Sequence, residues 1–382
     1  MMIIISKNSL KFIYKSTFLP GIPFTFKQIL YFRANKLIPA RMATDRPVTI
    51  KDIARKFKCS PSTVSRALNN HPLINEDTRR NLQEYAQKVG YQRNSVSLSL
   101  LNKRTGTLGV IVPSLNHQHE TTIIEGLQSV LQPQGYLMNI CVTNESYALE
   151  KEYVEKLLAN RVEGIFLSIS QETYDSGHYE HLESIIQRKV PLIFIDREYE
   201  GFEAGRVTID DYLGAFAATE HLIKMGCKRI AHLKGPQGLA ITEQRFLGYT
   251  ECLKKYNLPV LEELIVSTNF QIESAIIPTQ RLLDLPQPPD GIFGVNDQVA
   301  IGAMHVVKER GLHIPNEMAV VGFDDSPISA YIFPSLTTVR RPGKQIGAEA
   351  ARIFLNEAIQ KSSAESLMLP AALVIRESSL KS

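Results

Sequence analysis

The side chains best suited to chemistry lie in one stretch, Val48–Leu68, and that chemistry is recognition. One side of a short helix in this stretch carries small hydrogen-bonding groups and one guanidinium, namely Ser62, Thr63, Ser65 and Arg66. A guanidinium can donate two hydrogen bonds to one guanine, so such a face suits the reading of base edges in the DNA major groove. We therefore expect this stretch to be a helix-turn-helix.

Two short helices joined by a tight turn must position this face. Thr49 can cap the first helix, with Asp52 in the acidic position of a capping box. Ser60 can cap the second helix, with Pro61 at its first position. Apolar residues recur at helical spacing in both helices: Ile50, Ile53, Ala54 and Phe57 in the first, and Val64, Ala67 and Leu68 in the second.

A third helix completes a headpiece that we place at residues 46–91. Asn75 can cap this helix, acids fill its first turn, and Gly90 can end it. Residues 92–105 then form a linker in which Ser and Asn are frequent. The linker is too short to be a stable helix alone, so we expect it to become helical only when another contact orders it.

Residues 1–45 do not fit either pattern. Residues 1–41 contain seven Lys or Arg and no acid, and their apolar run is far too short to span a membrane. Three interpretations remain open. The segment is translated upstream sequence before a true start at Met42, or a disordered basic arm that adds non-specific DNA affinity, or a targeting or membrane anchor.

Charge separates the chain into a basic module and an acidic body. Residues 42–104 carry a net charge of +7, and the remainder from residue 105 onward carries about −10. This is the footprint of a DNA-binding head on a larger domain. The four cysteines are far apart, without a Cys-x-x-Cys pair, which indicates neither a zinc site nor a disulfide framework and fits a reducing cytoplasm.

From Thr107 onward the pattern changes to strands and helices in alternation. The strand candidates are Leu108–Val112, Leu137–Val142, Gly164–Ile169, Leu192–Ile195, Arg206–Ile209, Ile230–Leu233, Leu264–Val266, Gly291–Val295, Met318–Gly322 and Leu373–Arg376. Amphipathic helices fall between them, for example Glu120–Leu131, Tyr212–Met225 and Gly343–Ile359. Continuous apolar strands separated by helices predict an α/β core of two doubly wound parallel-sheet subdomains, with a ligand crevice at the carboxyl ends of the strands.

Ordered matches along the chain resemble the lactose/galactose repressor (LacI/GalR) family. The headpiece matches are Val48-Thr49-Ile50, Asp52-Ile53-Ala54, Ser60, Thr63 to Asn69, Thr78-Arg79, Gly90-Tyr91 and Asn94. The core matches are Phe194 to Arg197, Val207, Asp210, Gly214-Ala215, His221 to Ile223, Arg245, Gly248-Tyr249, Asn296-Asp297, Val321 to Asp325 and Leu336 to Val339. The resemblance covers residues 46 to 378.

The resemblance implies a dimeric transcription factor with a periplasmic-binding-protein-like core at 106–378. It places subdomain 1 at about 106–208 and 339–362, and subdomain 2 at about 209–336 and 363–378. The linker would form a hinge helix in the DNA minor groove, where Leu100 and its symmetry mate wedge into the central base step. The hinge departs from the family pattern at two positions: Arg93 stands where the family usually has Pro, and Ser97 stands where it usually has Ala.

The family pattern also assigns the DNA-binding side chains. Ser62 and Arg66 would read base edges and Pro61 would contribute shape, while Arg66 has the alternative of touching phosphate only or capping its own helix. The residues expected to position the DNA backbone are Thr49, Ser60, Thr63, Ser65, Asn69, Asn75 and Tyr91, with Asn94, Ser97 and Leu100 in the hinge.

Two residues are the leading candidates for an effector pocket. Arg245 and Asp324 could grip vicinal hydroxyls from two subdomains and so close the cleft. The second rank is Asn296, Asp196 and Arg197, together with Phe270, at the position of a stacking aromatic in the family. The alternative for Asp196 and Arg197 is an interdomain salt bridge, and Asp325 is interpreted as a loop or capping carboxylate.

Catalytic and metal-binding interpretations fit the sequence poorly. The run His117-Gln118-His119-Glu120 resembles a metal cluster, but alternate residues at a helix start point apart. Gly235-Pro236-Gln237-Gly238 lacks the Lys-Ser/Thr of a phosphate loop, and Gly-x-Ser-x-Gly does not occur. We therefore expect no enzyme, no metal and no cofactor.

These observations predict a cytoplasmic transcriptional regulator, a repressor, whose affinity for a pseudo-palindromic operator is controlled by a small effector. A sugar or sugar derivative is favoured by the polar, charged pocket candidates. A purine or nucleotide effector and a solute-binding protein without DNA function are the alternatives, and induction and co-repression are both allowed. No heptad tail follows the last strand, so we expect a homodimer.

Overall fold

Two units make up the chain, Met1–Arg93 and Asn94–Ser382. The computed structural model describes residues 5–6, 9–10, 48–91, 104–116, 118–199, 201–360 and 365–381, without the side chains of 5–6, 9–10 and 358–360. Within the predicted extension 1–45 it describes only β1 (Ile5–Ser6) and β2 (Ser9–Leu10), which pair antiparallel. The hinge residues Arg93, Asn94, Ser97 and Leu100 lie outside the described residues.

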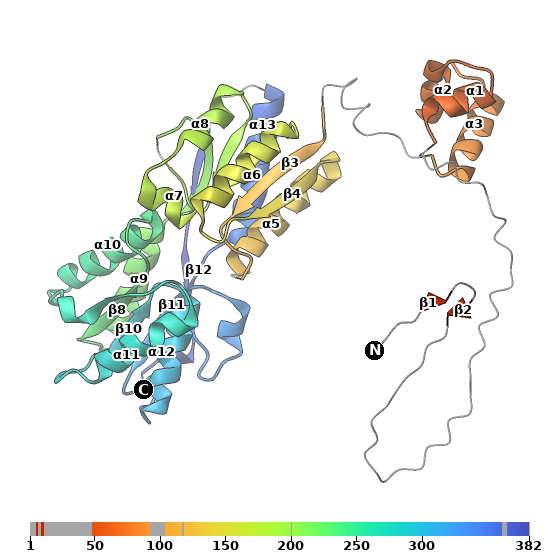
Figure 1. Ribbon diagram of the computed structural model, residues 1–382. Coiled ribbons are helices and arrows are strands. Elements are labelled where there is room, and N and C mark those ends of the chain that lie inside the picture. Colours follow the sequence, from red (N-terminus) through yellow and green to blue (C-terminus); the bar gives the residue numbers. More distant parts are fainter. Residues whose placement is uncertain are drawn as a thin grey trace, which may run out of the picture. The chain divides into compact units, whose positions relative to one another are not determined.

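The first unit contains the predicted three-helix headpiece, formed by α1 (Ile50–Lys56), α2 (Pro61–Leu68) and α3 (Glu76–Lys88) (Figure 1). Asp52 accepts a hydrogen bond from the Thr49 backbone at 3.0 Å, and the Ser60 hydroxyl accepts one from the Thr63 backbone at 3.1 Å. These contacts satisfy amide groups that the helix starts leave open. The buried apolar side chains of all three helices pack into one small core, consisting of Ile53, Ala54, Val64, Ala67, Leu82 and Ala86.

The second unit, called the core here, is built on two six-stranded sheets. The first sheet has the order β13-β7-β6-β5-β3-β4, with β3 (Thr107–Val112), β4 (Leu137–Val142), β5 (Ile165–Leu167), β6 (Leu192–Ile195), β7 (Gly205–Ile209) and β13 (Ser366–Leu369). The second has the order β14-β12-β11-β10-β8-β9, with β8 (Ile230–Lys234), β9 (Ile265–Ser267), β10 (Gly291–Gly294), β11 (Ala319–Asp324), β12 (Thr337–Arg340) and β14 (Ala372–Val374). All neighbours are parallel except β12 and β14.

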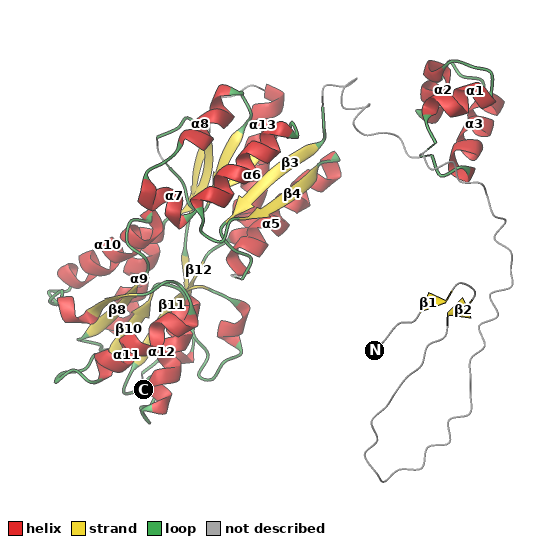
Figure 2. Ribbon diagram, in the orientation of Figure 1, coloured by secondary structure: helices red, strands yellow, loops and turns green. Residues whose placement is uncertain are grey.

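Helices cover both faces of each sheet, which is the doubly wound arrangement expected from the sequence (Figure 2). The first lobe holds α5 (Gln118–Leu131), α6 (Tyr147–Ala159), α7 (Gln171–Ser176), α8 (Glu180–Gln187) and α13 (Gly343–Gln360). The second lobe holds α9 (Asp211–Lys224), α10 (Ala240–Lys255), α11 (Ile276–Leu283) and α12 (Asp297–Glu309). In the first lobe α5 packs against α13, and α6 packs against α8.

The chain passes between the lobes three times, after β7, after β12 and after β13. The predicted assignment of residues 363–378 to the second subdomain is wrong for β13, because this strand pairs with β7 in the first sheet. Residues 337 and 338, left unassigned, and 339 and 340, placed in subdomain 1, belong to β12 in the second sheet. Neither strand was identified from sequence, because both are short and β12 is rich in Thr.

A histidine lies in the middle of the second lobe's core. His232 on β8 is fully buried, and its ring stacks on Phe293 with the centroids 4.8 Å apart and on Tyr249 at 5.0 Å. Its Nδ1 lies 3.0 Å from the Phe293 carbonyl oxygen. Burial lowers the pKa of His232 to about 4, since an imidazolium is poorly solvated there. The folded core therefore holds this residue neutral.

This burial predicts an acid-dependent loss of stability. Between pH 6.5 and about 4 the unfolded chain binds a proton at His232 that the folded chain does not. The free energy of unfolding should therefore fall with the pH across this window, by roughly 3 kcal/mol from this residue. In urea titrations at several pH values, His232→Phe should lose that part of the pH dependence, whereas the exposed His305→Phe should keep it. Equal slopes for the wild type and His232→Phe would contradict the account.

Candidate functional site

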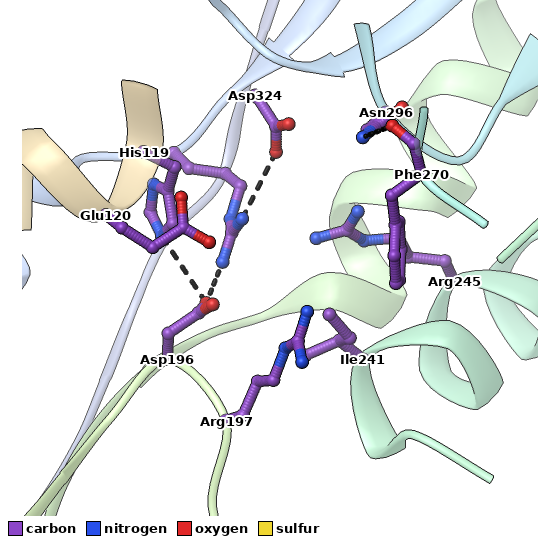
Figure 3. Close-up of a pocket in the computed structure, with 10 residues that line it drawn as sticks. His119, Glu120, Asp196, Arg197, Ile241, Arg245, Phe270, Asn296 and Asp324 are labelled. Carbon is purple, nitrogen blue, oxygen red and sulfur yellow. Dashed lines mark hydrogen bonds and ion pairs between the residues drawn. The ribbon is translucent and has the colours of Figure 1, made fainter. Parts of the chain in front are cut away.

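A cavity lies between the two lobes of the core, at the carboxyl ends of their strands. It is lined by His119, Glu120, Asp196, Arg197, Ile241, Arg245, Phe270, Asn296, Asp324 and Arg341 (Figure 3). All six residues expected from sequence to bind an effector are in this set. The structure thus brings them together, with Asp196 and Arg197 in the first lobe and the other four in the second.

Four lining residues were not expected: His119, Glu120, Ile241 and Arg341. In the sequence, His119 and Glu120 stand out only as part of a run that resembles a metal cluster, whose His117 lies outside the described residues. Their place at the start of α5, directly after β3, was the available signal, because helix starts at the carboxyl ends of strands face the crevice. Arg341 follows β12, so its position becomes evident only once that strand is recognised.

Arg245 is held rigidly on α10. Its Nε donates to Asp211 at 2.7 Å, its Nη1 donates to the Val295 carbonyl at 2.6 Å, and its Cζ lies 3.8 Å from the centre of the Phe323 ring. The side chain is 1% exposed. Its Nη2 has no hydrogen-bond partner among the described residues, which leaves one strong donor for something in the cavity.

Arg197 lies on the opposite wall, in the first lobe. Its Nη1 donates to both carboxylate oxygens of Glu145, at 3.0 and 2.8 Å. Its Cζ is 5.6 Å from the centre of the Phe270 ring in the second lobe, within reach of a cation–π attraction. The expected alternative of a salt bridge between the lobes does not describe Arg197, because Glu145 belongs to its own lobe.

Arg341 connects the lobes. Its guanidinium forms an ion pair with Asp196, at the end of β6, and another with Asp324, at the end of β11, where Nη1 donates at 3.1 Å. Burial lowers the pKa of Arg341 to about 10, which still leaves it charged at neutral pH. Asp196 thus does take part in a salt bridge between the lobes, and Arg341 is its partner.

The carboxyl groups of the cavity are strongly affected by burial. Burial raises the pKa of Glu120, whose Oε2 has no hydrogen-bond partner among the described residues. Burial also raises the pKa of Asp324 well above its ordinary value, and the nearby charge of Arg245 opposes that rise. His119 Nε2 lies 3.4 Å from Asp196. Burial therefore disfavours additional negative charge in this part of the cleft.

The backbone is strained at three lining positions. Asp196 and Phe270 have φ of +69°, and Asp324 has φ of +122°. Such conformations cost about 1–3 kcal/mol each and occur most often at ligand clamps and switches. Asn296 supports one of them, because its Nδ2 donates to the Phe270 carbonyl at 2.9 Å while its Oδ1 caps α12. Much of the amide of Asn296 is therefore already used within the protein.

Asp297 and Asp325 support the wall rather than line the cavity. Asp297 accepts hydrogen bonds from the Ser326 backbone and the Ser329 hydroxyl, both at 2.7 Å, and from the Thr338 hydroxyl. Asp325 pairs with Arg340 and Arg376, each at 2.6 Å. The interpretation of Asp325 as a structural loop carboxylate agrees with these contacts.

The free space in the cleft is unevenly divided. The central cavity is the smallest of three, with a volume of about 30 Å³. A cavity of about 220 Å³ adjoins it at Asp196, Arg197 and Ile241, and one of about 400 Å³ adjoins it at His119, Asp324 and Arg341. The Arg341 ion pairs therefore fill the narrow middle of a longer cleft.

The headpiece exposes the predicted reading face. Ser62, Arg66 and Asn69 are exposed along α2 at a spacing of four and three residues, which places them on one side of the helix. Pro61, Thr49, Ser60 and Asn75 are exposed as well, and Thr63, Ser65 and Tyr91 are half-buried. Residues 48–91 contain eight Lys or Arg and four acids. The described headpiece is therefore basic, with one arginine on the outer side of its second helix.

No described helix is long and apolar enough to cross a membrane.

Family models match both parts of the chain. Residues 49–94 match the model described as bacterial regulatory proteins, lacI family, and residues 219–379 match a periplasmic binding protein-like domain. The fold is similar to that in the crystal structure of the lac repressor dimer bound to operator and the anti-inducer ONPF. The TM-score is 0.78, and the identity is 24% over 88% of this chain and all of that chain. A complex of the regulator CelR with cellobiose has a TM-score of 0.66 and 25% identity over 87% of this chain and all of that chain.

Sequence comparison gives the same assignment independently. The chain is 32% identical to the ribose operon repressor of Halalkalibacterium halodurans over 331 residues, which are 86% of this chain and 96% of that protein. The match includes both the headpiece and the core, in the same order. The chain therefore belongs to the LacI family of DNA-binding transcriptional regulators.

Proposed function

We propose that the protein is a repressor that binds a pseudo-palindromic operator as a homodimer and releases it when a sugar or sugar derivative binds in the cleft of the core. The observation that carries the proposal is the meeting of Asp196 and Arg197 with Arg245, Phe270 and Asp324 around one cavity between two lobes. Charged groups and an aromatic ring that converge from two sides suit a small polar ligand.

The chemistry of the lining favours a polyhydroxylated ligand. Carboxylates accept hydrogen bonds from pairs of hydroxyls, and guanidiniums donate to hydroxyl oxygens. Arg245 Nη2 and Arg197 Nε are buried without a hydrogen-bond partner among the described residues, and both belong to cavity-lining side chains. The face of Phe270 can pack on a sugar ring. The names of two similar proteins, a ribose operon repressor and a regulator solved with cellobiose, point to the same class.

The proposed mechanism is linkage between two binding sites. An effector that prefers one arrangement of the lobes shifts the orientation of the first lobe, whose β3 begins directly after residues 92–105. We propose that this segment, with Asn94, Ser97 and Leu100, folds as a hinge on the operator and unfolds on induction. A coupling of about 1–3 kcal/mol is typical of such regulators.

Exposed apolar side chains support the proposed homodimer. The edge strand β4 leaves Leu137 70% exposed and Ile140 46% exposed, and the turn after Pro327–Ala330 leaves Tyr331 85% and Phe333 80% exposed. Open strand edges with apolar side chains are usually covered. A twofold axis beside β4 would cover both copies of this edge with one interface.

The first test concerns DNA reading by Arg66. With an operator selected from a random library, Arg66→Ala should weaken operator binding by about 1–3 kcal/mol, roughly 5- to 150-fold, because a bidentate contact to guanine is lost. Binding to scrambled DNA should change much less. Arg80→Ala removes a charge of the same sign from α3. It should lower the affinity for the operator and for scrambled DNA to a similar, small extent. If Arg66→Ala also lowers the affinity for the operator and for scrambled DNA by the same factor, Arg66 contacts phosphate only.

The second test concerns the effector class. At least one of the sugars ribose, cellobiose and galactose should raise the melting temperature of the protein. The purines adenine, guanine and hypoxanthine should not raise it. A ligand at about 100 times its dissociation constant stabilises by about 2.7 kcal/mol. Asp324→Asn should abolish the shift, whereas Asp284→Asn, at the exposed end of α11, should keep it. A response to purines alone would replace the sugar assignment.

The third test concerns assembly. Leu137→Glu combined with Ile140→Glu should convert the dimer to monomers in sedimentation equilibrium, because two like charges per subunit would then face each other across the axis. Leu247→Glu on α10, which replaces another partly exposed leucine, should leave the dimer intact. An unchanged dimer in the β4 variant would move the interface elsewhere.

A further inference from the structure

One side chain in the cleft occupies the place that a ligand would need. The Arg341 side chain is 5% exposed, and its ion-pair partners Asp196 and Asp324 are 5% and 13% exposed. Because its guanidinium pairs with both, Arg341 stands between the carboxylates of Asp196 and Asp324. Asp196 directly follows β6 of the first lobe, and Asp324 is the last residue of β11 in the second lobe.

The remaining space does not admit a sugar ring beside it. The central cavity has a volume of about 30 Å³, against about 220 and 400 Å³ in the two cavities that share lining residues with it. A sugar ring with its hydroxyls is several times larger. A ligand can therefore reach Asp196 and Asp324 together only if the guanidinium of Arg341 withdraws. Arg341 also lines the cavity of about 400 Å³. That cavity has room for the guanidinium when it leaves the two aspartates.

The charges that stay behind restrict what can replace it. Arg197 is paired with Glu145, and Arg245 is paired with Asp211. Without Arg341, Asp196 and Asp324 are two buried carboxyl groups without a guanidinium paired to them, although Arg245 lies near Asp324 and His119 lies 3.4 Å from Asp196. This arrangement is costly unless the ligand supplies donors. Hydroxyl groups or an ammonium group can supply them. A carboxylate or phosphate on the ligand would face both aspartates and would be repelled.

We propose that Arg341 is an internal occupant of the effector site, which the effector displaces by donating hydroxyl or ammonium hydrogens to Asp196 and Asp324. This inference rests on the proposed function in one respect, namely that the cleft takes a small effector. It makes Arg341 the residue that determines charge specificity: neutral sugars or amino sugars bind, and the corresponding uronates and sugar phosphates do not.

The occupancy can be tested without knowing the effector. Arg341→Ala leaves a hole of guanidinium shape between two aspartates, so millimolar methylguanidinium should raise its melting temperature in a saturable way, compared with equal sodium chloride. The wild type, whose site is filled, should show no such rise. Arg340→Ala removes the neighbouring arginine, which pairs with Asp325 outside the central cavity, and should also show none. If Arg341→Ala folds only with methylguanidinium present, the inference is supported in the same way.

The displacement is tested by ligand affinity. Arg341→Gln should bind a neutral sugar about tenfold or more tightly than the wild type, because the wild-type site is open for only a small fraction of the time. Galactose against galacturonate, and ribose against ribose 5-phosphate, are the matched pairs, and in the wild type the charged member of each pair should bind more weakly. Weaker sugar binding by Arg341→Gln would overturn the inference, because Arg341 would then hold the ligand.

The two proposals can fail separately. If methylguanidinium stabilises Arg341→Ala but no sugar or amino sugar binds any variant, Arg341 does occupy the site and the proposed effector class is wrong. If sugars stabilise the wild type but Arg341→Ala shows no saturable response to methylguanidinium, the effector class is supported and the role of Arg341 as an occupant is wrong.

Discussion

A buried charge is tolerated only where an opposite charge meets it, and the cleft of the core is arranged around this constraint. Three guanidiniums, of Arg197, Arg245 and Arg341, are paired there with four carboxylates. Arg197 pairs within the first lobe and Arg245 pairs within the second lobe. Of these three guanidiniums, only that of Arg341 pairs with carboxylates of both lobes. Because removing one partner of a buried pair typically costs about 3–5 kcal/mol, we infer that the relative arrangement of the lobes responds to what stands between Asp196 and Asp324.

The path of the chain places Arg341 where the two lobes are joined. The chain crosses between the lobes three times, and Arg341 itself lies on the second crossing, between β12 and α13. Arg341 is therefore joined by the chain to a strand of one lobe and to a helix of the other. In the proposed mechanism the first lobe then transmits the change to residues 92–105, and the headpiece gains or loses its operator.

Sequence was sufficient for the parts that local patterns determine. Caps and helical spacing located the three headpiece helices, continuous apolar runs located most of the strands, and the family resemblance named six residues that meet at one cavity. It failed where a strand carries little apolar signal. Thr337–Arg340 is held by pairing and by the hydrogen bond from Thr338 to Asp297, and β13 is defined by its pairing with β7. Arg341, beside an unrecognised strand, was missed for the same reason.

If the cleft and the DNA site are linked, the linkage can be measured in both directions. The full-length protein is titrated with the stabilising sugar in the absence and in the presence of saturating operator, and with operator in the absence and in the presence of saturating sugar. Each ligand should lower the affinity of the other by the same factor, about 5- to 150-fold. Equal sugar affinity with and without operator would contradict this linkage.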